Sequence, residues 1–217
     1  GNMDKKEPTQ WQVMSTGIEE TVPLELYSPK QGAQLISAIG DYGGFTHLDL
    51  DRPVPSGSHA DPYYSNTTDI TGAEDQPDLV VRVGTVSHHH PEGKPMDGGK
   101  SWLEPVSLPQ EKAQNGHVAV SSDGRTWIWT PDRMPVYYTN DRGVTWSTAE
   151  GILENLRVIA DRVNPKHFYA LDLSAAVLYE SMDGGVSFRS HPLPFAPFDS
   201  KARNARGDRR GGQDRVY

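Results

Sequence analysis

The sequence contains no cysteine among its 217 residues. This absence excludes disulfides, thiolate metal ligands and a cysteine nucleophile. No stretch approaches the roughly 20 consecutive apolar residues of a membrane-spanning helix, so we expect no membrane partner. Basic residues are outnumbered, with 21 Lys and Arg against 29 Asp and Glu and a formal net charge of -8 at pH 7. Because this charge repels phosphate backbones, we expect no nucleic acid partner either.

Glycine and proline are plentiful, with 21 Gly and 17 Pro, while 35% of the residues are hydrophobic. The hydrophobic share is enough for a core, and the turn-forming residues are typical of many short strands. We therefore expect an all-β fold without long helices. Strands are predicted at residues 35–40, 79–83, 117–120, 126–129, 136–139, 167–171 and 176–180.

A short template recurs along the chain: a hydroxyl residue, Asp, Gly, a second hydroxyl residue and an aromatic residue. It surrounds Asp141 and Asp183, and a weaker copy surrounds Asp97, with spacings of 44 and 42 residues. This spacing is the length of one four-stranded propeller blade. In such a turn Asp accepts backbone hydrogen bonds, Gly adopts positive φ and the aromatic residue anchors the hairpin. We predict β-propeller blades with Asp-box (BNR repeat) hairpins, in which these three Asp residues are structural.

The repeat length divides the chain into about four to five blades. We interpret residues 1–10 as a leader with an expression-vector remnant and residues 11–217 as a propeller segment, incomplete as a ring, from a larger two-propeller protein. The polar stretch Leu50–Gln76 predicts a loop or lid. The Gly- and Arg-rich stretch Lys201–Tyr217 is interpreted as a solvated loop rather than a binding arm.

Asp41 is the acidic residue that stands apart from the repeat. A predicted strand runs into it, and Gly43 and Gly44 follow. Glycines at such a place let a second backbone or a ligand approach closely. The local pattern leaves two readings open, a catalytic carboxylate and an ordinary turn.

Several segments, in this order and spacing, resemble the xyloglucanases of glycoside hydrolase family 74. The likeness extends from about Trp11 to Phe188. It is carried by residues 17–21, 36–50, 65–68, 77–84, 118–124, 135–141 and 164–170.

The resemblance implies two tandem seven-bladed propellers that face each other across a cleft. In that family the cleft binds the β-1,4-glucan backbone of xyloglucan and hydrolyses it with inversion, using one Asp from each propeller. Asp41 matches the general acid of the second propeller, so this chain is expected to be a partial seven-bladed propeller. The base belongs to an N-terminal propeller that the sequence does not contain. The resemblance also implies a secreted or periplasmic protein. The sequence departs from the family pattern at Tyr42, where a smaller aliphatic residue is expected after the acid.

Inverting hydrolysis needs two carboxyl groups about 6.5–9.5 Å apart, one protonated and one ionised. This chain is expected to supply only one of them. We therefore expect an oligosaccharide or polysaccharide substrate for the whole protein and no activity for the isolated chain.

Aromatic and histidine side chains are the remaining candidates for substrate binding. His47 either lines the same cleft as Asp41 or packs structurally. Flat sugar faces stack well on aromatic rings, although propeller aromatics are commonly core residues. The candidates are Tyr42, His47, Tyr63, Tyr64, Trp127 and Trp129.

No metal or cofactor is expected. The run His88–His90 is interpreted as a surface or cleft rim, because consecutive strand residues point to alternate faces and no carboxylate cluster accompanies them. The alternative function is a non-catalytic propeller that binds glycan or protein. A sialidase would require an arginine cluster and a Tyr/Glu nucleophile pair, which the sequence does not display.

Overall fold

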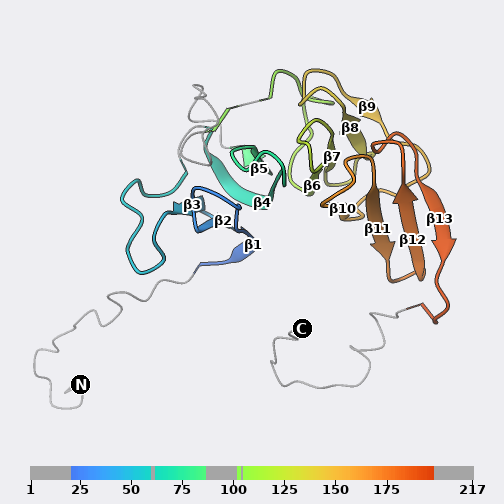
Figure 1. Cartoon of the computed structure of the whole chain (residues 1–217), viewed down its shortest axis with the longest axis horizontal. Helices are drawn as coiled ribbons and strands as arrows, with labels where there is room; N and C mark the ends of the chain where they lie inside the picture. The colour runs from blue at the N-terminus through green and yellow to red at the C-terminus, as the bar shows by residue number, and fades with distance from the viewer. Residues whose placement is uncertain (1–20, 60–61, 87–101, 104, 198–217) are drawn as a thin grey trace, which may run out of the picture.

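The computed structural model describes residues 21–59, 62–86, 102–103 and 105–197, which form thirteen strands and no helix. The strands make four sheets that follow one another along the chain in an open arc (Figure 1). Every pair of named strands is antiparallel. The predicted all-β fold of propeller blades is confirmed, and the ring is not closed.

The sheets have three, two, four and four strands. The first contains β1 (Pro23–Tyr27), β2 (Leu35–Ile39) and β3 (Gly43–His47), and the second contains β4 (Tyr64–Gly72) and β5 (Val80–Val86). The third contains β6 (His117–Val120), β7 (Trp127–Thr130), β8 (Tyr137–Thr139) and β9 (Ser147–Thr148). The fourth contains β10 (Val158–Ala160), β11 (Phe168–Asp172), β12 (Val177–Ser181) and β13 (Arg189–Pro192).

Strand β4 corrects the prediction of a loop or lid over Leu50–Gln76. Residues 64–72 of that stretch are the longest strand in the described chain. The stretch is polar, yet its Thr and Ile residues favour extended backbone. Its buried Asp69 is paired, because one carboxylate oxygen accepts the Val118 N–H at 2.9 Å. The polar sequence was therefore mistaken for a loop, although its buried carboxylate is bound by a neighbouring sheet.

Apolar clusters join each sheet to the next. Ile36 and Ala38 of the first sheet meet Ile70 and Val80 of the second, and Trp102 completes this cluster. The second sheet packs on the third in the same way, through two further clusters.

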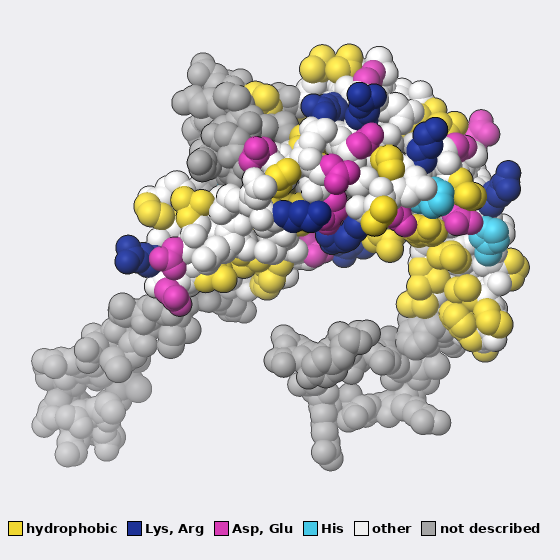
Figure 2. Space-filling model, viewed as in Figure 1, with side chains coloured by type: hydrophobic (Ala, Val, Ile, Leu, Met, Phe, Trp, Pro, Cys, Tyr) yellow, Lys and Arg dark blue, Asp and Glu magenta, His cyan; other side chains and the backbone are white. Residues whose placement is uncertain are grey.

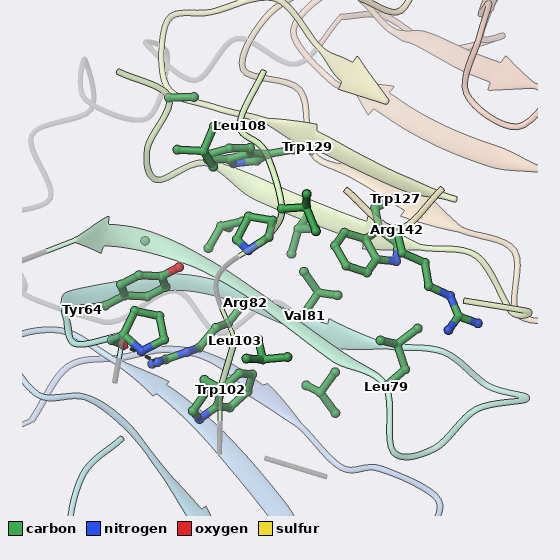
Figure 3. A pocket seen from close by; sticks show the side chains of 18 of the residues that line it. Tyr64, Leu79, Val81, Arg82, Trp102, Leu103, Leu108, Trp127, Trp129 and Arg142 are labelled. Carbon is green, nitrogen blue, oxygen red and sulfur yellow. Dashed lines mark hydrogen bonds between the residues drawn. The ribbon is translucent and has the colours of Figure 1, made fainter. Parts of the chain in front are cut away.

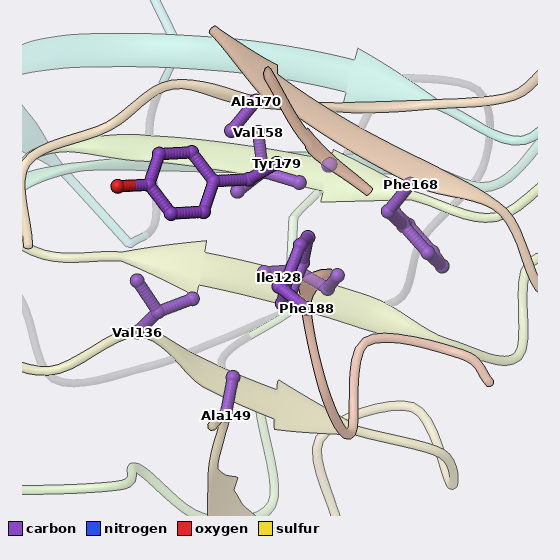
Figure 4. Close-up of a cluster of buried hydrophobic side chains, with 9 residues drawn as sticks. Ile128, Val136, Ala149, Val158, Phe168, Ala170, Tyr179 and Phe188 are labelled. Carbon is purple, nitrogen blue, oxygen red and sulfur yellow. The ribbon is translucent and has the colours of Figure 1, made fainter. Parts of the chain in front are cut away.

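The largest cluster lies between the third and fourth sheets, where Ile128 and Phe168 are fully buried (Figure 4). Burial of one such side chain stabilises the fold by about 1.5–3 kcal/mol. These contacts hold neighbouring sheets together, since a single sheet cannot cover its own faces.

The first strands of the four sheets line a cavity of about 280 Å³ on the inner side of the arc. Arg157, which precedes β10, reaches across it. Its guanidinium contacts Glu25 of β1 at 2.5 Å and Asp69 of β4 at 3.4 Å. The fourth sheet is thus linked to the first and second by charge, whereas its apolar packing is against the third.

The outer surface is mixed in character. Acidic and basic side chains are interspersed over the face seen in Figure 2, whereas hydrophobic side chains gather at the end of the fourth sheet. Leu171, Leu173 and Phe195 are each 45–50% exposed there. No other sheet of the described chain covers this end.

The hairpin that follows β8 is organised by one carboxylate. Asp141 accepts hydrogen bonds from the Thr139 hydroxyl at 2.7 Å and from the Val144 and Thr145 N–H groups at 3.1 and 2.8 Å. The Thr145 hydroxyl donates to its second oxygen at 2.6 Å. Hydrogen bonds from Thr145 and then Thr139 lower the pKa of Asp141 to about 2. All four of these hydrogen bonds come from residues of the same turn.

The hairpin after β12 repeats this arrangement around Asp183. The Ser181 hydroxyl, the Ser187 N–H and the Ser187 hydroxyl donate to its carboxylate at 2.8, 3.0 and 2.6 Å. Phe188, the aromatic residue of the template, is buried in the cluster between the third and fourth sheets.

A buried polar cluster joins the first two sheets. Arg82 of β5 is 6% exposed, and its guanidinium stacks between the Tyr64 and Trp102 rings at 4.5 and 4.4 Å. It lies 3.5 Å from His59, whose other ring nitrogen is 3.0 Å from the Thr46 hydroxyl. Burial lowers the pKa of Arg82 to about 10. Burial, and then the charge of Arg82, lower the pKa of His59 to about 3.

We expect Asp183→Ala to lower the free energy of unfolding by about 1–2 kcal/mol, because two hydroxyls and one N–H lose their acceptor. Urea unfolding of the purified chain measures this change. Glu154→Ala is the matched control, since Glu154 is exposed and makes no hydrogen bond in the described structure. Equal unfolding midpoints for the two variants would show that the turn does not depend on Asp183.

We also expect stability to fall on mild acidification. The pKa of His59 is near 3 in the folded chain and about 6.5 when unfolded, so the unfolded state binds more protons between these values. The free energy of unfolding therefore decreases as the pH falls from about 6.5 to 5. Thermal melts of the chain and of His59→Gln test this, and the variant should lose much of the pH slope. Identical slopes would refute the assignment to His59.

Candidate functional site

Asp41 lies in the tight turn between β2 and β3. Its φ is 68°, in the left-handed region that residues other than glycine rarely adopt. Gly43 and Gly44 follow with φ of 73° and 135°. A Cβ on Gly44 would lie 1.9 Å from the Ser37 carbonyl oxygen, and one on Gly43 would lie 2.7 Å from that of Tyr64. The two glycines thus allow neighbouring backbone to approach the turn closely. The sequence had allowed either a second backbone or a ligand to approach here.

Side chains at the start of the second sheet hold the backbone of Asp41. Its N–H donates to Asn66 Oδ1 at 2.9 Å, and its carbonyl oxygen accepts the Tyr63 hydroxyl at 3.1 Å. The side chains of Asp41 and Tyr42 are exposed, Tyr42 at 49%. The Asp41 carboxylate forms no hydrogen bond or ion pair with the residues that the structure describes. Among the described residues, therefore, nothing binds this carboxylate, while the turn that carries it is held in place.

The same rim of the arc carries other polar side chains. The β2–β3 turn lies at this rim, together with the start of β4 and the end of β5, which pair with each other. The start of β6 and the end of β7, which also pair, lie next to them. Asn115, before β6, accepts the Thr85 hydroxyl at 2.6 Å and donates to Asp132 at 3.2 Å. Asn155, before β10, accepts the Arg133 N–H at 2.9 Å. Asp41 therefore belongs to a polar edge shared by several sheets.

His47 is not close to Asp41 in this fold. It pairs with Leu35 at the far end of the β2–β3 hairpin, whereas the turn follows the Ile39–Gly43 pair. Its Nε2 lies 3.3 Å from the Ser37 hydroxyl. The structure therefore shows His47 in contact with its own hairpin. A role of His47 in substrate binding stays a prediction.

The two candidate tryptophans of β7 are buried, at 7% exposure for Trp127 and 6% for Trp129. Their indole N–H groups donate to the carbonyl oxygens of Gly124 and Asn115 at 3.1 and 2.8 Å. Trp129 packs edge-on against Trp146 at 6.2 Å. These rings are integrated in the core, and their contact with a sugar stays a prediction.

The larger pocket, of about 680 Å³, is bordered by Trp127, Trp129, Tyr64 and Arg82 (Figure 3). Val86 and Trp102, which flank the undescribed residues 87–101, also line it. Asp41 is not among the lining residues. We therefore assign no function to this pocket.

The predicted His88–His90 rim and the Asp97 turn lie outside the described residues. Within the described ranges, no three His, Asp or Glu side chains cluster as a metal site. The same ranges contain no helix that is long and apolar enough to cross a membrane.

Sequence reasoning missed Asn66 as a functional candidate and assigned Tyr63 to substrate stacking. The structure instead connects both side chains to the Asp41 backbone. The only sequence signal was that residues 65–68 belong to the segments that carry the family resemblance.

Comparisons with known proteins give consistent matches, although no family model matches the chain. A xyloglucanase of Paenibacillus sp is 38% identical over 206 residues, which are 93% of this chain and 20% of the relative. A xyloglucanase of Acetivibrio thermocellus is 36% identical over 188 residues, 86% of this chain and 22% of the relative.

A solved structure agrees with these sequence matches. The crystal structure of the family 74 xyloglucanase from Xanthomonas campestris aligns with a TM-score of 0.70 and 38% identity, over 80% of this chain and 25% of that one. The chain thus spans about a fifth to a quarter of the length of these relatives. With its open arc of antiparallel sheets, the chain belongs to glycoside hydrolase family 74.

Proposed function

We propose that the whole protein containing this chain hydrolyses the β-1,4-glucan backbone of xyloglucan, with Asp41 as its general acid. The observation that carries the proposal is an exposed carboxylate, unpaired within the described part of the chain, on a turn that two neighbouring side chains hold in place. The xyloglucanase relatives support the substrate class. The polar rim around the turn offers many hydrogen-bonding groups to a hydroxyl-rich polysaccharide.

The chemistry assigns Asp41 one half of the reaction. As the acid, it protonates the glycosidic oxygen while the bond to the anomeric carbon breaks. A second carboxylate removes a proton from the water that attacks the opposite face, which inverts the configuration. We propose that this base comes from a second propeller, outside this chain, that faces the rim.

Two smaller proposals accompany this function. The matching turns around Asp141 and Asp183 are Asp boxes, which the shared hydrogen-bond pattern supports. The protein acts outside the cytoplasm, in the periplasm or in the medium, because a polymeric substrate does not cross a membrane freely.

The isolated chain is expected to lack hydrolytic activity, since it supplies one of the two required carboxylates. Reducing-sugar release from xyloglucan by the purified chain is the measurement. Turnover that disappears in Asp41→Ala would contradict the proposed division of the site.

In the whole protein, Asp41→Asn is expected to lower kcat on xyloglucan by about 10²–10⁴-fold, the usual contribution of a general acid. Asp51→Asn provides the matched control, because Asp51 is an exposed carboxylate of the same region. Calorimetry should find xyloglucan binding largely retained in Asp41→Asn. Binding by a wild-type protein without any turnover would instead favour a non-catalytic glycan-binding propeller.

A further inference from the structure

The backbone of Asp41 is held from outside its own hairpin. Gly40 and Gly44 donate the backbone hydrogen bonds of this turn, to Val22 and Tyr42 at 3.0 and 2.8 Å. Asp41 takes part in no backbone–backbone hydrogen bond of the described chain outside the strand ladders. Its N–H and C=O are instead bound by the Asn66 and Tyr63 side chains. An unfavourable φ of 68° persists at such a residue only where its surroundings impose it.

An irregularity in β4 places Asn66 for this contact. The pairing of β4 with β5 shifts register between Tyr64 and Asn66, so that Tyr64 pairs with Val86 and Asn66 with Thr85. Such bulges turn a side chain away from its regular direction and are frequent next to active sites. Here the side chain that follows the shift accepts the Asp41 N–H.

Arg82 fixes the segment that carries Tyr63. Its Nη2 donates to the Pro62 carbonyl oxygen at 2.6 Å, and its guanidinium plane is stacked between the Tyr64 and Trp102 rings. Arg82 is buried and has no carboxylate partner in the described chain. Arg82 therefore holds the main chain of the residue before Tyr63 and the ring of the residue after it, which restricts Tyr63 as well.

We propose that Tyr63 and Asn66 are positioning residues that hold the Asp41 carboxylate where the glycosidic oxygen is protonated. This inference rests on the proposed function of Asp41. An aspartate has only two side-chain torsions, so a fixed backbone restricts its carboxylate to a few positions. Without the two hydrogen bonds the residue relaxes from the left-handed conformation, and the carboxylate leaves the reactive geometry. Misplacement of this kind lowers kcat much more than KM.

The test compares Tyr63→Phe and Asn66→Ala with Asp41→Asn in the whole protein on xyloglucan. Each positioning variant is expected to lower kcat about tenfold with KM changed less than about twofold. Tyr169→Phe is the matched control, because among the described residues the hydroxyl of Tyr169 in β11 hydrogen-bonds only with His167, at 3.4 Å. This control is expected to keep the wild-type kcat.

A conservative variant separates positioning from general loss of structure. Asn66→Asp keeps the acceptor for the Asp41 N–H and should retain most of kcat. Its added carboxylate makes loss of the acid's proton harder, so the alkaline limb of the kcat profile should move to higher pH. The limb shift reports a charge close to the acid, whereas the retained kcat, set against the loss in Asn66→Ala, shows that the hydrogen-bond acceptor is what the site requires.

Hydrogen exchange on the purified chain tests the contact without any activity. The Asp41 amide should exchange faster in Asn66→Ala than in wild type, while amides of β12 keep their rates. This measurement also shows whether the variant is folded.

The outcomes distinguish the two proposals. Wild-type kcat in both Tyr63→Phe and Asn66→Ala, with activity lost in Asp41→Asn, would overturn the positioning role and leave the proposed function intact. Full activity in Asp41→Asn would overturn the proposed function and the positioning role with it.

Discussion

Apolar packing between consecutive sheets is the interaction on which the other features of this chain depend. Each sheet has few and short strands, and none of them could bury its two faces alone. The clusters around Ile36, Val120 and Ile128 lie between one sheet and the next. They fix the angle between neighbouring sheets, and that angle generates the arc.

The arc in turn explains where polar groups gather. Because every sheet begins with its innermost strand, the first strands converge on one side and Arg157 reaches both Glu25 and Asp69. The contact is partly exposed, so its contribution to stability is modest compared with the apolar clusters. At the rim, the turn between two strands of one sheet meets the first residues of the next sheet. Asp41 sits at such a junction, which is why side chains of β4 and its lead-in hold it.

The two kinds of aspartate in this chain differ in what surrounds them. The carboxylates of Asp141 and Asp183 accept hydrogen bonds on both oxygens from hydroxyl and N–H donors of their own turns. Asp41 has the opposite arrangement, since its backbone is bound and no residue that the structure describes binds its carboxylate. A carboxylate of the first kind stabilises a hairpin, whereas one of the second kind is available for chemistry.

The sequence by itself determined the all-β class and the blade-length repeat, because turn residues and apolar periodicity are local properties, and the likeness of several segments indicated the family. It also singled out Asp41 through the strand and glycines around it. Only the tertiary structure decided that residues 64–72 form a strand, that Trp127 and Trp129 are buried, and that His47 lies at the other end of its hairpin from Asp41. The tertiary structure also decided that Tyr63 and Asn66, more than twenty residues away in sequence, form hydrogen bonds with the Asp41 backbone. Such contacts depend on register and on the packing of one sheet against the next, which no local pattern of residues encodes.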